Sequence, residues 1–188
     1  MPPSEPRERL LRTATRLFYE EGINGVGVDR VVAEAGVTRA TMYRHFPGKQ
    51  ALVVAYLDHE DEVIRELFAN AAELAAASKA SPQELLALVI DGIADDATRL
   101  HTRGCPFINA SAEFPDAGGP VRQVVRRHRD WFRQTLTELT TAAGLADPAS
   151  TAAALVLLRD AMLVGNYLDG SDVAVDFRAT ARRVAGLD

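Results

Sequence analysis

Residues 22–52 of the chain combine basic, hydroxyl and apolar side chains at spacings that could hold a polyanion. The segment is GINGVGVDRVVAEAGVTRATMYRHFPGKQAL. Its periodicity predicts two short helices, over residues 29–35 and 39–46, joined by Gly36, Val37 and Thr38. Gly36 can take the left-handed backbone that ends the first helix. Thr38 can cap the second helix, whose free N–H groups form a positively polarised end at which a phosphate binds.

The second of these helices has an apolar base and a polar outer face. Met42 and Phe46 can pack into a small core, while the outward side chains are Arg39, Thr41, Tyr43, Arg44 and His45. An arginine can bind guanine through two hydrogen bonds, and tyrosine and histidine can bond phosphate oxygens. The pattern therefore predicts the recognition helix of a helix-turn-helix.

The charges are distributed in a way that agrees with a DNA-binding head. The whole chain carries a net charge of −5, which by itself argues weakly against nucleic acid. Residues 1–50, however, contain eight basic and six acidic side chains, whereas the remaining residues contain 13 and 20. Because a charged surface acts only within about 10 Å at physiological salt, a locally basic head can bind phosphates on an acidic protein.

A continuous, ungapped set of positions in this segment matches one known signature. The matching residues are Gly22, Val28, Asp29, Val31, Ala35, Gly36, Val37, Thr38, Tyr43, His45, Phe46, Lys49 and Leu52. Together with the first helix, this stretch of about 45 residues resembles the N-terminal signature of the TetR family of transcriptional regulators. The resemblance implies an operator-binding helix-turn-helix joined to a helical domain that binds an effector and dimerises.

The resemblance also assigns roles to single residues. By it, Thr38, Tyr43, His45 and Lys49 contact the DNA backbone, while the side chains facing base edges are Arg39, Ala40, Thr41 and Arg44. The sequence departs from the family pattern where Gly27 and Gly48 replace the common serine or threonine caps. Ala40 in place of a frequent glycine offers a methyl group suited to a thymine methyl.

The rest of the chain shows helical periodicity and no strand signal. Together with the motif it predicts an all-α protein of about nine helices, with further helices over about 7–21, 49–78, 81–100, 107–113, 121–143, 147–168 and 171–186. Ser81-Pro82, Asp147-Pro148 and Ser171-Asp172 are the expected starts of three of them. We expect a DNA-binding domain at residues 1–48 and an effector-binding and dimerisation domain at residues 49–188.

The helix that contains residues 152–164 is apolar almost all round, interrupted only by Arg159 and Asp160. A helix that is apolar on every face needs cover on every face, and a second subunit can supply it. In the family that the motif resembles, the last two helices commonly pair across a two-fold axis. We therefore expect a homodimer formed by the last two helices.

Apolar side chains in the expected second domain can enclose a small effector. The candidate pocket residues are Leu86, Val89, Ile93, Phe107, Ile108, Asn109, His128, Trp131, Leu158 and Arg159, of which Asn109, His128 and Arg159 are the polar anchors. Cys105 could be an electrophile or redox sensor, although a small packing or pocket-lining residue is the simpler interpretation. The pattern favours a largely apolar effector that releases a repressor from a palindromic operator.

Enzymatic chemistry finds no support in the residue pattern. No nucleophile and base are suitably placed, and no His, Cys, Asp or Glu residues have metal-ligand spacing, so we expect no catalytic site, metal or cofactor. His128-Arg129-Asp130 resembles a kinase loop only by coincidence, and Glu60-Asp61-Glu62 is expected to be a solvated face. The alternative is a helical small-molecule-binding protein or enzyme with a vestigial DNA-binding head.

The composition indicates where such a protein would act. With 47% hydrophobic and 25% charged residues the chain resembles a folded globular protein and not a disordered one. No uninterrupted apolar run reaches the roughly 18 residues that span a bilayer, and no signal peptide is expected. A lone cysteine fits a reducing compartment. These features predict a cytoplasmic protein without membrane partners.

Overall fold

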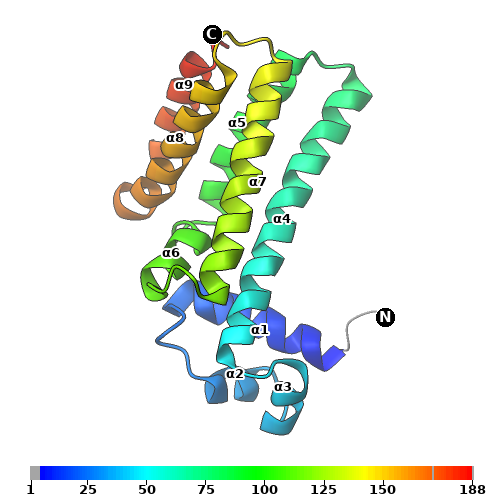
Figure 1. The fold of residues 1–188 in the computed structure, drawn as a ribbon, viewed down its shortest axis with the longest axis vertical. Helices are drawn as coiled ribbons and strands as arrows, with labels where there is room; N and C mark the ends of the chain where they lie inside the picture. The colour runs from blue at the N-terminus through cyan, green and yellow to red at the C-terminus, as the bar shows by residue number, and fades with distance from the viewer. Residues whose placement is uncertain (1–4, 171, 188) are drawn as a thin grey trace. The chain divides into compact units, whose positions relative to one another are not determined.

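The computed structural model of the chain describes residues 5–170 and 172–187, and within them it contains nine helices and no strand (Figure 1). This confirms the predicted all-α class. The helices are α1 (Glu5–Glu21), α2 (Val28–Glu34), α3 (Arg39–His45), α4 (Lys49–Ser78), α5 (Pro82–Arg99), α6 (Pro106–Glu113), α7 (Pro120–Ala142), α8 (Pro148–Asp169) and α9 (Asp172–Val184). Their ends lie within about two residues of the predicted ones. The expected start at Ser171 lies outside the described residues.

The contacts divide the chain into two compact units. Unit 1 comprises Met1–Asp61 and Pro106–Arg126, and unit 2 comprises Glu62–Cys105 and Arg127–Asp188. Helices α4 and α7 therefore contribute residues to both units, and α6 belongs to the unit of the first three helices. The functional division expected after residue 48 stays a prediction.

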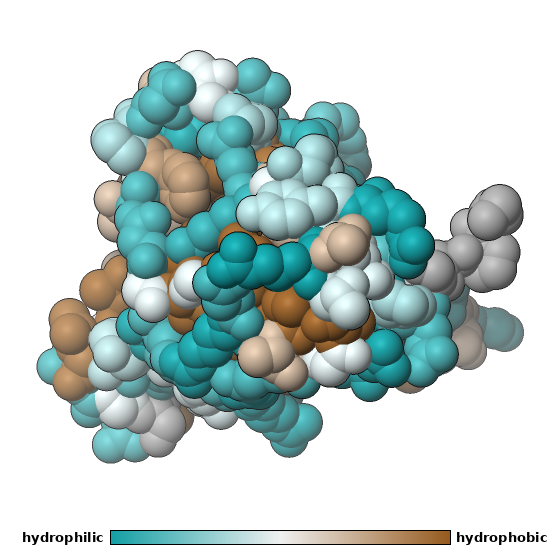
Figure 2. Space-filling model, turned by 90° about the horizontal axis from the view of Figure 1, so that it is seen from below, coloured by the Kyte–Doolittle hydropathy of each residue, from teal (hydrophilic) through white to brown (hydrophobic). Residues whose placement is uncertain are grey.

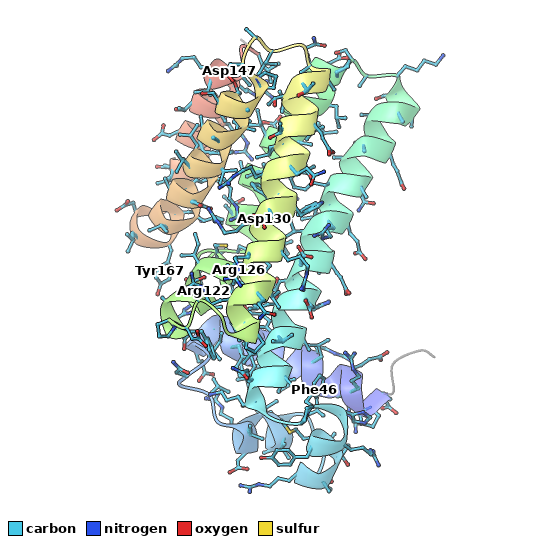
Figure 3. The ribbon with its side chains drawn as sticks, viewed as in Figure 1. Phe46, Arg122, Arg126, Asp130, Asp147 and Tyr167 are labelled. Atoms are coloured by element: carbon cyan, nitrogen blue, oxygen red, sulfur yellow. The ribbon has the colours of Figure 1, made fainter. Side chains whose placement is uncertain are left out.

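Local capping rules explain where the helices begin and end. Ser81 accepts a hydrogen bond from the Glu84 backbone while the Glu84 carboxylate accepts from the Ser81 backbone, which completes a capping box at α5. The Glu84 carboxylate accepts from the Ser81 backbone and also from the Ser81 hydroxyl, and these two bonds hold the pKa of the Glu84 carboxyl below its ordinary value. Asp147 caps α8 by accepting from the Ser150 backbone at 3.1 Å, and Figure 3 shows it at the start of that helix.

Unit 1 is built on the apolar stripe of α1. Its buried residues are Leu10, Ala14, Leu17 and Phe18. Gly22 ends the helix with a φ of +85°. The Glu113 carboxylate of α6 then accepts hydrogen bonds from the backbone N–H groups of Ile23, at 2.9 Å, and Asn24, at 2.5 Å. This carboxylate ties α6 to the segment that leads into α2.

Unit 2 contains the pair α8 and α9, which pack side by side and against α5 (Figure 1). The buried residues of α9 are Ala174, Phe177 and Ala181. On its flank, Arg182 forms an ion pair with Asp91 of α5 at 2.6 Å, and Arg178 pairs with Asp95. These ion pairs fasten the flank of α9 to α5.

One expectation for α4 is wrong. Glu60 and Asp61 were expected on a solvated face, yet they are 9% and 7% exposed, and both have interaction partners. The reason is helical spacing: Glu60 lies one turn from both Tyr56 and Ile64, which are buried. Three consecutive acidic residues suggested an exposed face, although two of them lie on the buried side of the helix.

One helix of the described part of the chain, α8, is long and apolar enough to cross a membrane by length and composition alone. The buried core helix of a soluble protein meets the same criteria. Only a third of its most apolar window is buried in the single chain. The uncovered part of α8 is described below with the proposed dimer.

Candidate nucleic-acid interface and ligand cavity

The turn between α2 and α3 has the geometry that the sequence predicted. Gly36 has a φ of +63°, and the Val37 N–H donates to the Val32 carbonyl at 3.2 Å, which closes the end of α2. The Thr38 side chain accepts from the Thr41 backbone at 3.1 Å and so caps α3. Its hydroxyl also lies 3.0 Å from that of Thr41.

Two buried side chains hold α3 in place. Met42 is fully buried at the centre of the helix, and Phe46 is buried where α3 ends and the chain turns towards α4 (Figure 3). The Arg7 guanidinium lies 5.3 Å from the centre of the Phe46 ring, a distance that favours a cation–π interaction. Because the anchors are apolar and buried, the opposite face of α3 stays available to a polar partner.

The predicted DNA-binding residues lie on or beside this free face. Thr38, Arg39, Ala40, Tyr43 and Arg44 are exposed, while Thr41, His45 and Lys49 are half-buried. The face of the molecule seen in Figure 2 is largely hydrophilic. Exposed arginine and tyrosine side chains on one short helix can reach base edges and phosphates together.

Many arginines of unit 1 are already paired with carboxylates. Arg16 and Arg30 both bind Glu34, and these two partners hold the pKa of the Glu34 carboxyl below its ordinary value. Arg39 pairs with Asp29, which raises the pKa of its guanidinium. Arg44 has no ion-pair partner among the described residues. It is therefore the arginine of α3 that DNA can engage without breaking an existing contact.

Lys49 stands at the start of α4. Partial burial lowers the pKa of its ammonium group, and the nearby Glu113 carboxylate opposes this shift. The same carboxylate receives the Ile23 and Asn24 backbone groups. A phosphate contact from Lys49 would therefore lie beside the point at which α6 is joined to the head.

Unit 2 contains a cavity between α4, α5, α7 and α8. Its empty volume is about 410 Å³ including the mouth open to solvent, and it is lined by Ile64, Leu67, Phe68, Ala71, Leu88, Val89, Gly92, Ile93, Asp96, Phe132 and Arg159. Only about 40 Å³ is open to the centre of a water molecule. A ligand larger than a few atoms must therefore displace side chains or enter through the mouth.

The structure brings part of the predicted pocket together. Val89, Ile93 and Arg159 line the cavity. The His128 ring stacks on Phe132 with 6.1 Å between centroids, and Trp131 meets Phe68 edge-on at 5.4 Å, so both lie directly behind the wall. Of the other predicted pocket residues, Leu86 is buried in the core and Leu158 lines a separate small hollow against α9. Phe107, Ile108 and Asn109 belong to unit 1.

Several lining residues were not singled out from the sequence. Phe68 and Phe132 supply the aromatic wall, and Asp96 supplies a carboxylate held 2.8 Å from the His101 ring nitrogen. Gly92 is an exposed lining residue, and an added Cβ there would meet no atom within 4 Å. A glycine inside an apolar helix was the one signal that could have marked α5 as a cavity wall, because glycine weakens a helix unless space or function requires it.

Cys105 is buried and does not line the cavity. Its sulfur lies 3.3 Å from Arg159 Nη1. Packing, the simpler of the two interpretations from the sequence, describes this position. Among the residues that the structure describes, no group of three or more His, Cys, Asp or Glu side chains could hold a metal ion.

Fold and site together define a helix-turn-helix protein. The pattern of bacterial regulatory proteins of the tetR family matches residues 10–56, and that of the tetracyclin repressor-like C-terminal domain matches residues 81–180. The chain belongs to the TetR family, which is a family of DNA-binding transcriptional regulators and not of enzymes. The resemblance drawn from the sequence is confirmed.

Individual relatives agree with this assignment. A TetR-family transcriptional regulator of known structure from Streptomyces coelicolor is 43% identical, with 97% of this chain and 95% of that one covered and a TM-score of 0.89. The HTH-type transcriptional regulator YjdC of Escherichia coli is 25% identical over 95% of this chain and 91% of its own length. LmrA of Bacillus subtilis is 36% identical over 70 residues, so this match spans 37% of that relative's length.

A more distant structure carries a ligand. A transcriptional regulator from Saccharomonospora viridis, solved in complex with choline, is 21% identical over 96% of this chain and 95% of that one, with a TM-score of 0.78. At this identity the likeness shows the fold alone.

Proposed function

We propose that the chain is a cytoplasmic transcriptional repressor that binds a palindromic operator as a homodimer and leaves it when a small effector binds. The observation that supports it most is the free face of α3, where Tyr43 and Arg44 are exposed opposite the buried Met42. A vestigial head would have no reason to keep these side chains outward together. DNA binding therefore separates this proposal from that of a helical small-molecule binder or enzyme.

The test is direct. DNA fragments retained by the purified protein from a genomic library should share one palindromic sequence, and a labelled copy should shift in an electrophoretic assay. A Tyr43→Ala, Arg44→Ala double variant with unchanged circular dichroism should lose the shift. Wild-type protein that retains no fragment, or that binds all fragments equally, would contradict the proposal.

Dimerisation is supported by apolar residues that α8 and α9 leave uncovered. Leu157 and Leu168 of α8 are each 70% exposed, and the other exposed large apolar residues of this pair of helices are Val164 and Tyr167 of α8 and Val175 and Val184 of α9. Leu157, Ala161, Val164 and Leu168 are spaced by three or four residues and share one helix face. Contiguous exposed apolar surface of this kind is typical of a subunit interface.

Leu157→Glu tests this interface. The exposed position imposes no cost on the folded monomer, but the carboxylate would be buried in the dimer. Sedimentation at micromolar concentration should show a dimer for the wild type and a monomer for this variant, with Ala153→Glu at the edge of the stripe as the milder comparison. The two recognition helices of the dimer should meet half-sites about 34 to 36 Å apart, or more.

The effector is proposed to act through the unit 2 cavity. Helix α4 runs from the end of the head into this cavity wall, since it begins at Lys49 and contributes Ile64 and Phe68. A ligand that binds better to the arrangement unable to span the operator shifts the population towards it. A hundredfold preference would be worth about 2.7 kcal/mol per site. The choline-bound relative supports a small-molecule effector in this fold.

A further inference from the structure

Arg159 places a positive charge inside the apolar body of unit 2. Its side chain is 5% exposed, and its guanidinium lies 5.1 Å from the centre of the Phe132 ring. Burial opposes the charge, but the sulfur of Cys105 and the carboxylate of Asp160 outweigh this effect, so the pKa of Arg159 lies above its ordinary value. The group is therefore a cation at neutral pH.

The guanidinium of Arg159 is only partly satisfied. All its hydrogen bonds to described residues come from Nη1, which donates to Cys105 Sγ at 3.3 Å and to Asp160 Oδ1 at 3.2 Å. Nε and Nη2 have no acceptor among the residues described. Neither atom is among the fully buried polar atoms left without a partner, so both reach open space, where an acceptor from outside the protein can meet a charged donor.

The counter-charge of Arg159 is also shared. Asp160 accepts a second charged hydrogen bond, from Arg129 Nη2 at 2.8 Å. One carboxylate therefore serves two guanidinium groups, and this small cluster carries a net positive charge. The deficit is one negative charge, and Arg159 is the member of the cluster that lines the cavity.

The remaining walls of the cavity are almost entirely apolar. Its one carboxylate, Asp96, is already occupied, since both of its oxygens lie 2.8 Å from the His101 ring nitrogen. No ion pair joins Asp96 to Arg159. Phe68 and Phe132 offer aromatic surface, and α4 and α5 offer branched aliphatic side chains.

From this arrangement we propose that the cavity binds an amphipathic monoanion, a carboxylate on a short apolar chain or ring. The carboxylate accepts two parallel hydrogen bonds from Nε and Nη2 of Arg159, the fork geometry that arginine offers. The apolar part lies against Phe68 and Phe132. This names the chemical class of the effector and rests on the proposed function only in taking this cavity as the effector site.

The test is calorimetric titration of the full chain without DNA. Octanoate and hydrocinnamate should bind, and each should bind about 10- to 100-fold more tightly than its neutral amide, octanamide or hydrocinnamamide. Octyltrimethylammonium should bind no better than octanamide. Equal affinity for acid and amide, tighter binding of the ammonium probe, or no binding of either acid would overturn the proposal.

Two variants locate the binding. Arg159→Gln should abolish the preference for acid over amide. Because a buried substitution can impair folding, Gly92→Leu provides the independent test. It leaves Arg159 intact, projects a side chain into space that is empty around Gly92, and has the higher helix propensity. It should fold with an unchanged or higher melting temperature and weaken all probes at least about tenfold; wild-type affinity in this variant would overturn the site.

The separate gel-shift experiment keeps the two proposals apart. If the protein binds its operator but no carboxylate, only the ligand class fails. If octanoate binds through Arg159 but the protein never binds DNA, the anion site stands and the repressor proposal fails.

Discussion

Helices α3 and α8 use arginine in opposite ways. Arg39 on α3 keeps 67% of its side chain exposed and pairs with an equally exposed Asp29. Arg159 on α8 keeps only 5% of its side chain exposed, and it donates its hydrogen bonds to the side chains of Cys105 and Asp160. An exposed arginine stays hydrated and can exchange a carboxylate for a DNA phosphate at little cost. A buried one has lost its water and can exchange partners only with a molecule small enough to enter.

This difference separates the two functions that we propose for the chain. The head presents its charge outward on a short helix fixed by apolar anchors, which suits a large polyanion. Unit 2 encloses a charge in an apolar cavity, which suits a small ligand that is itself part apolar. The following experiments test whether the two arginine environments differ as described, from the largest expected effect to the smallest.

Asp160→Asn should give the largest loss of stability. It removes the shared counter-charge of Arg129 and Arg159, and the buried Arg159 cannot regain water. Breaking a pair of this kind costs about 3 kcal/mol, and urea denaturation should show it as a lower midpoint with an unchanged slope. The control is Asp130→Asn, at an exposed position of α7 (Figure 3). Equal midpoints for the two variants would mean that Arg159 is compensated elsewhere.

Arg44→Ala should change DNA binding and leave stability alone. If Arg44 binds a guanine through two hydrogen bonds, affinity for the preferred operator falls about 10- to 100-fold and discrimination at that base is lost. Lys49→Ala should weaken binding to all sequences alike and reduce the slope of log affinity against log salt concentration by about one. Fluorescence anisotropy on an operator and on single-base variants distinguishes them. An equal loss of affinity for all sequences in Arg44→Ala would indicate that Arg44 contacts the DNA backbone and not a base.

Glu113→Gln tests the attachment of α6 to the head. An amide can accept only one of the two bonds now made to the Ile23 and Asn24 backbone and carries no charge. The free energy of unfolding should fall by about 1 kcal/mol, against no change for Glu62→Gln at an exposed position of α4. Hydrogen exchange of the Ile23 and Asn24 amides should accelerate. Unchanged exchange would show that the carboxylate does not hold this segment.

Asp29→Asn should have the smallest effect on the protein and a measurable effect on binding. Both side chains of the pair with Arg39 are largely exposed, so the unfolding midpoint should not move. Releasing Arg39 and removing a negative charge beside α3 should tighten DNA binding by at most about fivefold. Fluorescence anisotropy at fixed salt measures the DNA affinity. The control is Arg39→Ala, which has no guanidinium to release and should show no gain in affinity. Weaker binding in Asp29→Asn would indicate that the pair orients Arg39 for DNA.

Much of the fold could be predicted because its rules are local. Gly36, Thr38 and the Ser81 capping box act on atoms within one turn of the chain, so residue type and spacing were sufficient. The buried stripe of α1 follows from a period that any short window shows. The same locality located the predicted recognition helix, whose anchors and polar face lie within residues 39–46.

The cavity and its charge depend on contacts that no window contains. Arg159 meets Cys105 across 54 positions and is covered by Phe132 of another helix. From the sequence, Arg159 was only one of several polar candidates, while Phe68, Gly92 and Asp96 carried too weak a signal to be chosen. Glu60 and Asp61 show the same limit, since burial follows from what packs against a helix. The sequence alone therefore determined the helices and the outward side chains of α3, because those depend on neighbours along the chain. Which charge is enclosed, and beside what, was decided only by the crossing of helices distant in sequence.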